Sequence, residues 1–279
     1  MSTPHGRPKA GSLPSGDGAK RQGVPAMSML TVESLTMAFG GVRAIDELSF
    51  QIRPGPVHSI IGPNGAGKKT LFNLITGVYQ PTSGRILLDG KDLARRSAHQ
   101  RACSGMNRTF QNLQVCMNMT ALENVMLGEH QHLDHRFLPA LLSLPRVRRG
   151  ERESRERSAD LMAFVGLSAY IDSDASAMPY GALKRLEIAR ALAARPRLLL
   201  LDEPAAGLND AETAELERLI RKLHGSGITV VLVEHDMKLV MNVSEHIVVL
   251  NYGRKLAEGT AREVRENPEV IAAYLGQPA

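Results

Sequence analysis

One segment of the chain has residue types and spacing suited to binding phosphate groups: Gly62-Pro63-Asn64-Gly65-Ala66-Gly67-Lys68 fits the pattern G-x-x-x-x-G-K. Glycines let backbone N–H groups approach a triphosphate, and a helix that starts at the end of the loop adds its partial positive charge. The ammonium of Lys68 can then reach the β- and γ-phosphates. We therefore predict a nucleotide site whose binding residues are Asn64, Gly65, Ala66, Gly67, Lys68, Lys69 and Thr70.

The residue after Lys68 departs from this pattern, which has Ser or Thr there as a ligand of Mg²⁺. The chain has Lys69 instead, with Thr70 one position later. Successive helical residues point about 100° apart, so we expect that Thr70 does not replace the missing hydroxyl. A second ammonium would also repel Mg²⁺, which neutralises charge in phosphoryl transfer. We expect hydrolysis to suffer more than nucleotide binding.

A pair of carboxylates follows a short apolar run. Leu198–Leu201 predicts a buried strand, and Asp202 and Glu203 come directly after it. At the end of such a strand Asp202 would lie beside the phosphate loop and hold a metal ion, often through water. Glu203 would lie where it can polarise an attacking water molecule. We therefore predict Asp202 as a metal ligand and Glu203 as a catalytic residue.

The elements that must position these residues alternate between strands and helices. Short apolar or alternating runs predict strands at 48–52, 57–61, 198–201, 229–233 and 247–250. The helix after the phosphate loop is expected to end at Gly77, and Asp210 to cap a second helix that ends at Gly225. This alternation predicts a parallel sheet with crossover helices. Helical periodicity over about 112–190 predicts an inserted helical subdomain.

The composition excludes several classes of protein. The 279 residues are 43% hydrophobic and 23% charged, with a net charge of +5, which is typical of a globular protein. Cys103 and Cys116 are too few for a disulfide scaffold, and we expect both thiols to be buried or half-buried. No apolar run approaches the roughly 18 residues of a membrane span. Residues 1–27, rich in Gly, Pro and Ser, predict a disordered tail without a secretory signal, before one domain over 28–279.

Three more segments accompany the phosphate loop and the carboxylate pair. They are Arg108-Thr109-Phe110-Gln111-Asn112, Pro204-Ala205-Ala206-Gly207-Leu208-Asn209 and Val233-Glu234-His235-Asp236. In this order they resemble the Q-loop, the D-loop and the switch-histidine segment of the ATP-binding subunit of ABC transporters. The resemblance runs from about Leu30 to the C-terminus. It implies an α/β fold, a P-loop NTPase of the ABC type with a mainly parallel sheet core, an antiparallel β portion, the inserted helical subdomain and a helical end at about 260–276.

The resemblance also implies ATP and Mg²⁺ as cofactors and assigns roles to single residues. Phe39 would stack on the adenine ring. Gln111 would sense the γ-phosphate or the metal ion, as a catalytic residue and metal ligand, and relay its state to membrane subunits. His235 would contact the γ-phosphate, as a third catalytic residue beside Glu203.

The signature segment of the family is altered in this chain. Met178-Pro179-Tyr180-Gly181-Ala182 stands where the family consensus resembles L-S-G-G-Q and the branched-chain amino acid branch has a Tyr-Gly version. Tyr180 and Gly181 would still bind ATP at a helix N-terminus, but Pro179 has no hydroxyl and Ala182 replaces Gln. In this family ATP lies between the phosphate loop of one subunit and the signature of the other. A homodimer would place every departure in both sites, so we expect a heterodimer.

The segments 74–84 and 267–276 are similar to the ATP-binding subunit of branched-chain amino acid importers. In the second segment we expect Val270, Ile271, Tyr274 and Leu275 to form one apolar stripe. The resemblance implies an ATPase that couples ATP binding and hydrolysis to import of branched-chain or other hydrophobic amino acids. Its implied partners are a second ATP-binding subunit, two transmembrane permease subunits and, indirectly, an extracytoplasmic solute-binding protein, without nucleic acid. Its implied place is the cytoplasmic face of the inner membrane, as a peripheral subunit.

Three alternatives stay open. A nucleotide-gated subunit that dimerises with ATP but hardly hydrolyses it would agree with Lys69, Pro179 and Ala182. The ATP-binding subunit for lipopolysaccharide export has a similar C-terminal ending, although the segment 79–81 and the long helical insert argue against it. A soluble ABC protein that acts on nucleic acid is disfavoured, because the basic residues of the N-terminal tail are too sparse.

Overall fold

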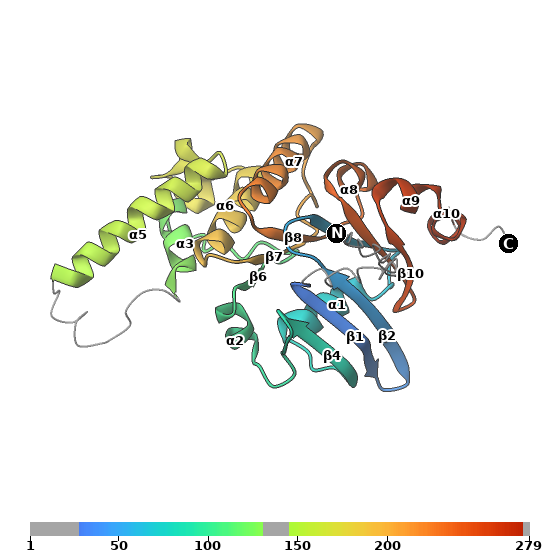
Figure 1. Ribbon diagram of the computed structural model, residues 1–279. Coiled ribbons are helices and arrows are strands. Elements are labelled where there is room, and N and C mark those ends of the chain that lie inside the picture. The colour runs from blue at the N-terminus through green and yellow to red at the C-terminus, as the bar shows by residue number, and fades with distance from the viewer. Residues whose placement is uncertain (1–27, 131–144, 276–279) are drawn as a thin grey trace, which may run out of the picture.

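The structure is a computed structural model that describes residues 28–130 and 145–275 (Figure 1). The tail expected over 1–27 lies outside the described residues. Two β-sheets form the body. The smaller, antiparallel sheet has the order β2-β1-β4-β5 and contains β1 (Leu30–Phe39), β2 (Val42–Ile52), β4 (Ser83–Leu88) and β5 (Lys91–Asp92).

The larger sheet carries the predicted catalytic elements. Its order is β10-β9-β3-β8-β7-β6, with β3 (Val57–Ile61), β6 (Met106–Arg108), β7 (Leu198–Asp202), β8 (Thr229–Val233), β9 (His246–Asn251) and β10 (Arg254–Gly259). All neighbours in it are parallel except the edge strand β10, which runs antiparallel to β9. Because the parallel strands point the same way, their carboxyl ends meet at one edge of the sheet.

Helices cover both faces of this sheet, and others extend beyond it. The helices of the described residues are α1 (Lys68–Thr76), α2 (Ala98–Cys103), α3 (Ala121–Gly128), α5 (Pro145–Phe164), α6 (Tyr180–Ala193), α7 (Asp210–Gly225), α8 (Met237–Val243), α9 (Ala261–Glu266) and α10 (Pro268–Leu275). In Figure 1, α1 lies between the two sheets, α6 and α7 lie on the other side of the larger sheet, and α5 reaches out beyond α3. The described part of residues 112–190 holds α3, α5, α6 and two short 3₁₀ helices.

The central strands are buried on both faces, which explains their unbroken apolar runs. Every residue of β3, β7 and β8 is buried. Side chains of a strand alternate between faces, so Leu198 and Leu200 pack in the core shared with α1 and the antiparallel sheet. Leu199 and Leu201 pack in the core shared with α3, α6 and α7. The sheet edge is thereby held rigidly from both sides.

Several helix boundaries follow the sequence signals, and one differs. Gly77 ends α1 in a left-handed conformation, and Gly225 is the last residue of α7, as predicted. Asp210 does not cap α7, however. The cap is Asn209, whose side chain accepts a hydrogen bond from the Glu212 backbone, while the Glu212 carboxylate accepts one from the Asn209 backbone. This reciprocal capping box satisfies two N–H groups at once, which a cap at the next residue would not.

The apolar stripe expected on α10 is covered only in part: Val270 is buried, but Ile271 and Tyr274 stay 44% and 37% exposed, because α10 lies at the rim of the molecule. One prediction about burial, that for Cys103, is wrong. The thiol of Cys103 is exposed at the end of the short helix α2, whereas Cys116 is half-buried. Within residues 28–130 and 145–275, no helix combines the length and the apolar character needed to cross a bilayer.

Candidate nucleotide site

The phosphate loop connects the carboxyl end of β3 to the start of α1. Two of its glycines have no room for a side chain. At Gly67, with φ of 98°, an added Cβ would lie 2.5 Å from the carbonyl oxygen of Ala44, and at Gly62 it would lie 2.2 Å from that of Leu250. Both positions therefore require glycine, and the loop backbone stays open to a ligand.

The side chain of Lys68 folds back across the loop. It is only 9% exposed, and its Nζ donates hydrogen bonds to the carbonyl oxygens of Gly62, at 2.6 Å, and Pro63, at 3.1 Å. Burial lowers the pKa of the Lys68 ammonium, and the nearby charges of Glu203 and Asp202 partly oppose that effect. The ammonium thus lies at the loop, where it can exchange these carbonyl oxygens for phosphate oxygens.

The phosphate loop and the carboxylate pair, far apart in the sequence, border one hollow of about 240 Å³. Its lining includes Ala44, Val233, Asp202, Glu203 and the loop residues Asn64, Gly65, Ala66, Gly67, Lys68, Lys69 and Thr70. The structure therefore brings together every predicted residue of the loop and both predicted carboxylates. Thr70 lines this hollow as well as Lys69.

Glu203 stands at the centre of a short chain of polar contacts at the rim of this hollow. Its Oε2 accepts a hydrogen bond from Nε2 of Gln111 at 3.0 Å and lies 3.8 Å from Nδ1 of His235. On the other side of the amide, Nζ of Lys69 donates to Oε1 of Gln111 at 3.4 Å. Glu203 also has φ of 47°, a left-handed conformation that costs about 1–3 kcal/mol and persists only where the surroundings enforce it.

Asp202 is held by an arginine that the sequence analysis gave no role. Nη2 of Arg108 lies 2.6 Å from Oδ2 of Asp202, and the two side chains are only 5% and 4% exposed. Nη1 of the same arginine donates to Oδ1 of Asn73 on α1 at 2.7 Å, and its guanidinium lies over the ring of Phe110. The signal in the sequence was that Arg108 begins the segment that also carries Gln111; its contact with Asp202 arises because β6, which Arg108 ends, pairs with β7.

The described residues do not fit Mg²⁺ well. Mg²⁺ prefers oxygen ligands in an octahedron, and the position of the expected hydroxyl holds the ammonium of Lys69. Oδ2 of Asp202 faces a guanidinium, and Oε1 of Gln111 faces an ammonium. Among the described residues there is also no group of three or more His, Cys, Asp or Glu side chains that could hold a metal ion.

A buried glutamate, which the sequence analysis also missed, connects the segments that carry Glu203 and His235. Glu234 is fully buried, and its carboxylate accepts hydrogen bonds from the backbone N–H groups of Ala205, at 2.8 Å, and His235, at 2.9 Å. The imidazole of His235 itself is 62% exposed. The histidine is therefore fixed through its backbone while its ring stays accessible to a ligand.

Five predicted residues do not line the hollow: Gln111 and His235 lie at its rim beside Glu203, and the other three lie elsewhere. Phe39 lies at the turn between β1 and β2, 46% exposed, and its ring meets that of Tyr79 edge-on with centroids 5.5 Å apart. Tyr180 and Gly181 begin α6, and the Tyr180 hydroxyl donates to the carbonyl oxygen of Ala206 at 3.3 Å. Neither residue is part of the lining that the phosphate loop and the carboxylate pair share.

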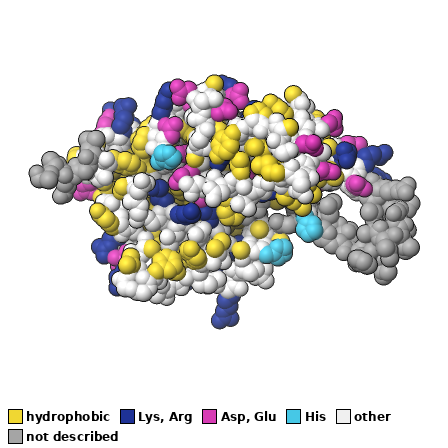
Figure 2. Space-filling model, turned by 180° about the vertical axis from the view of Figure 1, so that it is seen from behind, with side chains coloured by type: hydrophobic (Ala, Val, Ile, Leu, Met, Phe, Trp, Pro, Cys, Tyr) yellow, Lys and Arg dark blue, Asp and Glu magenta, His cyan; other side chains and the backbone are white. Residues whose placement is uncertain are grey.

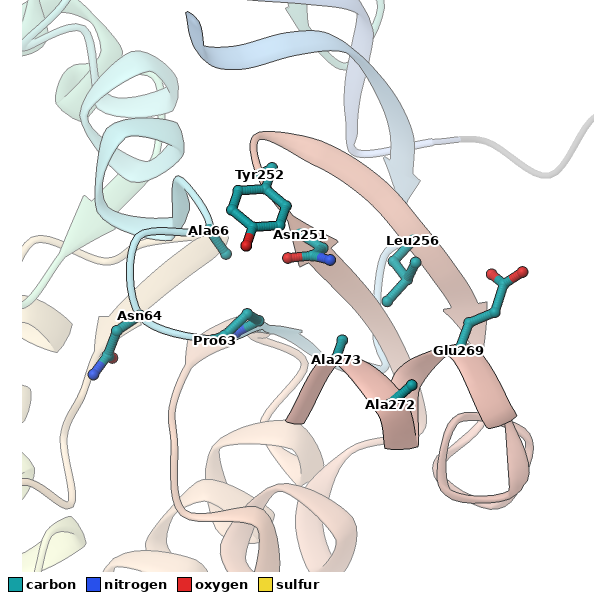
Figure 3. A pocket seen from close by; sticks show the side chains of 9 residues that line it. All are labelled: Pro63, Asn64, Ala66, Asn251, Tyr252, Leu256, Glu269, Ala272 and Ala273. Atoms are coloured by element: carbon teal, nitrogen blue, oxygen red, sulfur yellow. The ribbon is translucent and has the colours of Figure 1, made fainter. Parts of the chain in front are cut away.

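The outer side of the phosphate loop borders a second cavity, of about 590 Å³, between the loop and α10 (Figure 3). Its wall includes Pro63 and Asn64 from the loop, Tyr252 from the turn after β9, and Glu269 and Ala272 from α10. The C-terminal helix thus lies beside the phosphate loop, whose residues Asn64 and Ala66 line both hollows. Burial raises the pKa of Tyr274, on the same helix, to about 12, against the effect of a hydrogen bond from the Gly62 backbone.

Charges are mixed on the face of the molecule that Figure 2 shows. Lys and Arg side chains of the described residues lie there in small groups, with Asp and Glu between them, rather than in one broad basic field. The net charge of +5 is therefore not concentrated on this face.

Comparison with known proteins agrees with this geometry. A family model described as ABC transporter matches residues 45–206, and one described as branched-chain amino acid ATP-binding cassette transporter matches residues 254–279. Two curated relatives are high-affinity branched-chain amino acid transport ATP-binding proteins: BraF of Pseudomonas aeruginosa, 49% identical, and LivG of Escherichia coli, 44% identical. Each alignment covers 89% of this chain and 98% of the relative.

Solved structures agree as well. The ADP conformation of an ATP-binding cassette of an ABC transporter matches with a TM-score of 0.79 and 32% identity, covering 90% of this chain and 100% of that one. A nucleotide-free cassette matches with a TM-score of 0.78 over the same shares. The family and the fold class expected from the sequence are thereby confirmed. The chain belongs to the ABC transporter family, as an ATP-binding ATPase subunit with the C-terminal segment of the branched-chain amino acid branch.

Proposed function

We propose that this chain binds ATP in the hollow beside the phosphate loop and couples its hydrolysis to the import of branched-chain or other hydrophobic amino acids. The observation that carries the ATPase part is the position of Glu203, held between Gln111 and His235 at the rim of a hollow that the loop itself lines. The substrate part rests on the names of the relatives, BraF and LivG, and on the C-terminal family match.

In the proposed reaction, N–H groups of the loop and the ammonium of Lys68 bind the β- and γ-phosphates. Glu203 accepts a proton from water as the water oxygen attacks the γ-phosphorus, and the bond to the leaving ADP oxygen breaks. His235 donates to the γ-phosphate from the accessible side. Gln111 contacts Glu203 directly, so loss of the γ-phosphate changes the position of the segment that carries Gln111.

Mg²⁺ belonged to the expected cofactors and stays a prediction. Because the described donor set does not favour it, no step of this proposal depends on it. Phe39 is proposed to stack on the adenine ring, with Tyr79 supporting it edge-on. The division of the chain into a tail, a cassette body and a helical subdomain is part of the same proposal.

The proposed partners follow from the faces that the site leaves open. A second ATP-binding subunit would place its phosphate loop against Tyr180 and Gly181, and the absence of a hydroxyl at Pro179 favours a heterodimer. Next to the Gln111 segment lies a hollow of about 610 Å³, with the exposed side chains of Phe110 and Leu127 in its lining. We propose that a permease subunit docks there.

The proposal also includes a location at the membrane and an indirect partner. Two permease subunits would hold the chain at the cytoplasmic face of the inner membrane, as a peripheral subunit. An extracytoplasmic solute-binding protein would act through them, without contact to this chain. Both assignments rest on the names of the curated relatives as transport ATP-binding proteins.

The test is ATP hydrolysis by the purified chain, with and without its membrane partners. Glu203→Gln should lower the hydrolysis rate by about 100-fold or more, the contribution of a positioned general base. The matched control Glu151→Gln, an exposed glutamate on α5, should leave the rate unchanged. Equal rates for both variants would refute the role of Glu203. ATP binding without turnover, even with the partners, would instead support the alternative of a nucleotide-gated subunit. Lys69 agrees with that alternative.

A further inference from the structure

In each of the three side chains that would bind a divalent cation, one oxygen atom faces a donor group of the chain itself. Oε1 of Gln111 accepts from the ammonium of Lys69 at 3.4 Å. Oδ2 of Asp202 pairs with the guanidinium of Arg108 at 2.6 Å, and that pair is buried. Oε2 of Glu203 accepts from the amide of Gln111 at 3.0 Å. The site thus holds positive charge where the proposed chemistry would otherwise call for a metal ion.

Lys69 lies where a positive charge can reach both the bound phosphates and Gln111. It is the second residue of α1, its side chain is exposed, and it lines the same hollow as Asp202, Glu203 and Lys68. A lysine ammonium is a compact, strongly hydrated charge with three donors, which suits phosphate oxygens as well as the amide oxygen of Gln111. Its stem has four carbons, so the charge can move from one to the other without a change in the backbone.

We propose that the ammonium of Lys69 takes the place of the divalent cation, so that this chain binds the nucleoside triphosphate in its metal-free form. Lys68 and Lys69 then hold the β- and γ-phosphates together. Lys69 leaves Oε1 of Gln111 when it binds phosphate, which frees the amide to follow Glu203. This inference rests on the proposed ATP site and adds to it the ionic form of the nucleotide.

The charges at the start of α1 favour a bound anion that carries no metal ion. The helix begins with Lys68 and Lys69, and its first turn holds no acidic residue. Two lysines at the positive end of a helix dipole repel that end, which is unfavourable for the free protein. A bound tetra-anionic triphosphate relieves that repulsion, whereas a triphosphate that already carries a divalent cation relieves it less and brings a further positive charge near Lys69.

The experiment is isothermal titration calorimetry of the full chain with ATP, in excess Mg²⁺ and in excess EDTA. For the natural chain, the Kd in EDTA should be equal to or lower than the Kd in Mg²⁺. Lys69→Thr should weaken binding in EDTA by about tenfold or more, the loss of one charge-assisted hydrogen bond, and should regain affinity when Mg²⁺ is added. Lys69→Met should lose the same affinity in EDTA and regain none.

Controls separate this inference from the function it rests on. Lys91→Thr, at an exposed lysine of β5, should behave as the natural chain in both buffers. If the natural chain needs Mg²⁺ for binding as strongly as Lys69→Thr does, the inference is overturned while the ATP site stands. If ATP binds in neither buffer, the ATP site itself is refuted and the inference with it. A metal requirement that disappears in Thr70→Ala would overturn the inference by assigning the cation to Thr70.

Discussion

Replacing Arg108 with Met, which keeps much of the side-chain length but removes the charge, should destabilise the fold by about 3–5 kcal/mol. The reason is the ion pair with Asp202, whose atoms are 2.6 Å apart while the two side chains are only 5% and 4% exposed. Without the guanidinium, a carboxylate is left buried and uncompensated. The bond from Arg108 to Asn73 at 2.7 Å is lost as well, but this cost overlaps with the first and does not simply add to it.

The assay is urea unfolding followed by circular dichroism. With a slope of about 1–3 kcal/mol per molar urea, the loss of about 3–5 kcal/mol should lower the midpoint by roughly 1–5 M. Arg85→Met is the matched control, because Arg85 pairs with Glu33 at a similar 2.7 Å but with 63% and 42% of the side chains exposed. An exposed pair contributes about 0–1 kcal/mol, so this variant should barely shift the midpoint.

A second variant tests whether the unpaired charge is the cause. Adding Asp202→Asn to Arg108→Met should recover a large part of the lost stability, because a neutral amide leaves no buried charge. The reasoning is refuted if Arg108→Met shifts the midpoint no further than Arg85→Met does. It is also refuted if the double variant is as unstable as the single one.

Three other predictions follow from single contacts. Burial lowers the pKa of His58 to about 4 from an unfolded value near 6.5, so the unfolded chain binds the proton first. Stability should fall by up to about 3 kcal/mol through this group as the pH drops from 6.5 to 4. In pH-dependent urea titrations His58→Asn should reduce the slope, and the neighbouring His246, whose pKa burial also lowers, should account for part of what remains. Phe39→Ala should weaken ATP binding by about tenfold in calorimetry, since stacking on a base contributes about 1–3 kcal/mol, and a change below twofold would exclude the stacking role. Gly67→Ala should abolish ATP binding in calorimetry while the circular dichroism spectrum stays unchanged. The added Cβ would lie 2.5 Å from the carbonyl oxygen of Ala44, at a residue whose φ is 98°. Retained affinity would show that the loop backbone adapts.

Local signals were reliable where neighbours in the sequence decide the structure. The glycine at the end of α1, the apolar runs of β3, β7 and β8, and the phosphate loop between a strand and a helix all depend on residues a few positions apart. The cap of α7 was misplaced by one residue, because Asn209 and Asp210 are both good caps and the spacing of Asn209 to Glu212, which marks a capping box, was overlooked. The choice depends on Glu212, whose carboxylate completes the reciprocal bond with Asn209.

Burial at the edges of the molecule was less predictable. Ile271 and Tyr274 are apolar at helical spacing, yet α10 packs with one side only and leaves both partly exposed. An apolar stripe indicates which side chains share a face of a helix, but not how much of that face the rest of the chain covers. The exposed thiol of Cys103 has the same explanation, since α2 is a short helix whose only buried residue is Arg101.

By itself the sequence determined the phosphate loop, the carboxylate pair after β7 and the family, because each depends on residue types at short and regular spacing. Only the tertiary structure decided what surrounds them. Arg108 reaches Asp202, and Lys69 reaches Glu203 through Gln111, because β6 pairs with β7 and the loop after β3 opens at the same sheet edge. Such contacts join residues far apart in the chain, and sheet pairing rather than sequence spacing sets the distances at which charges act.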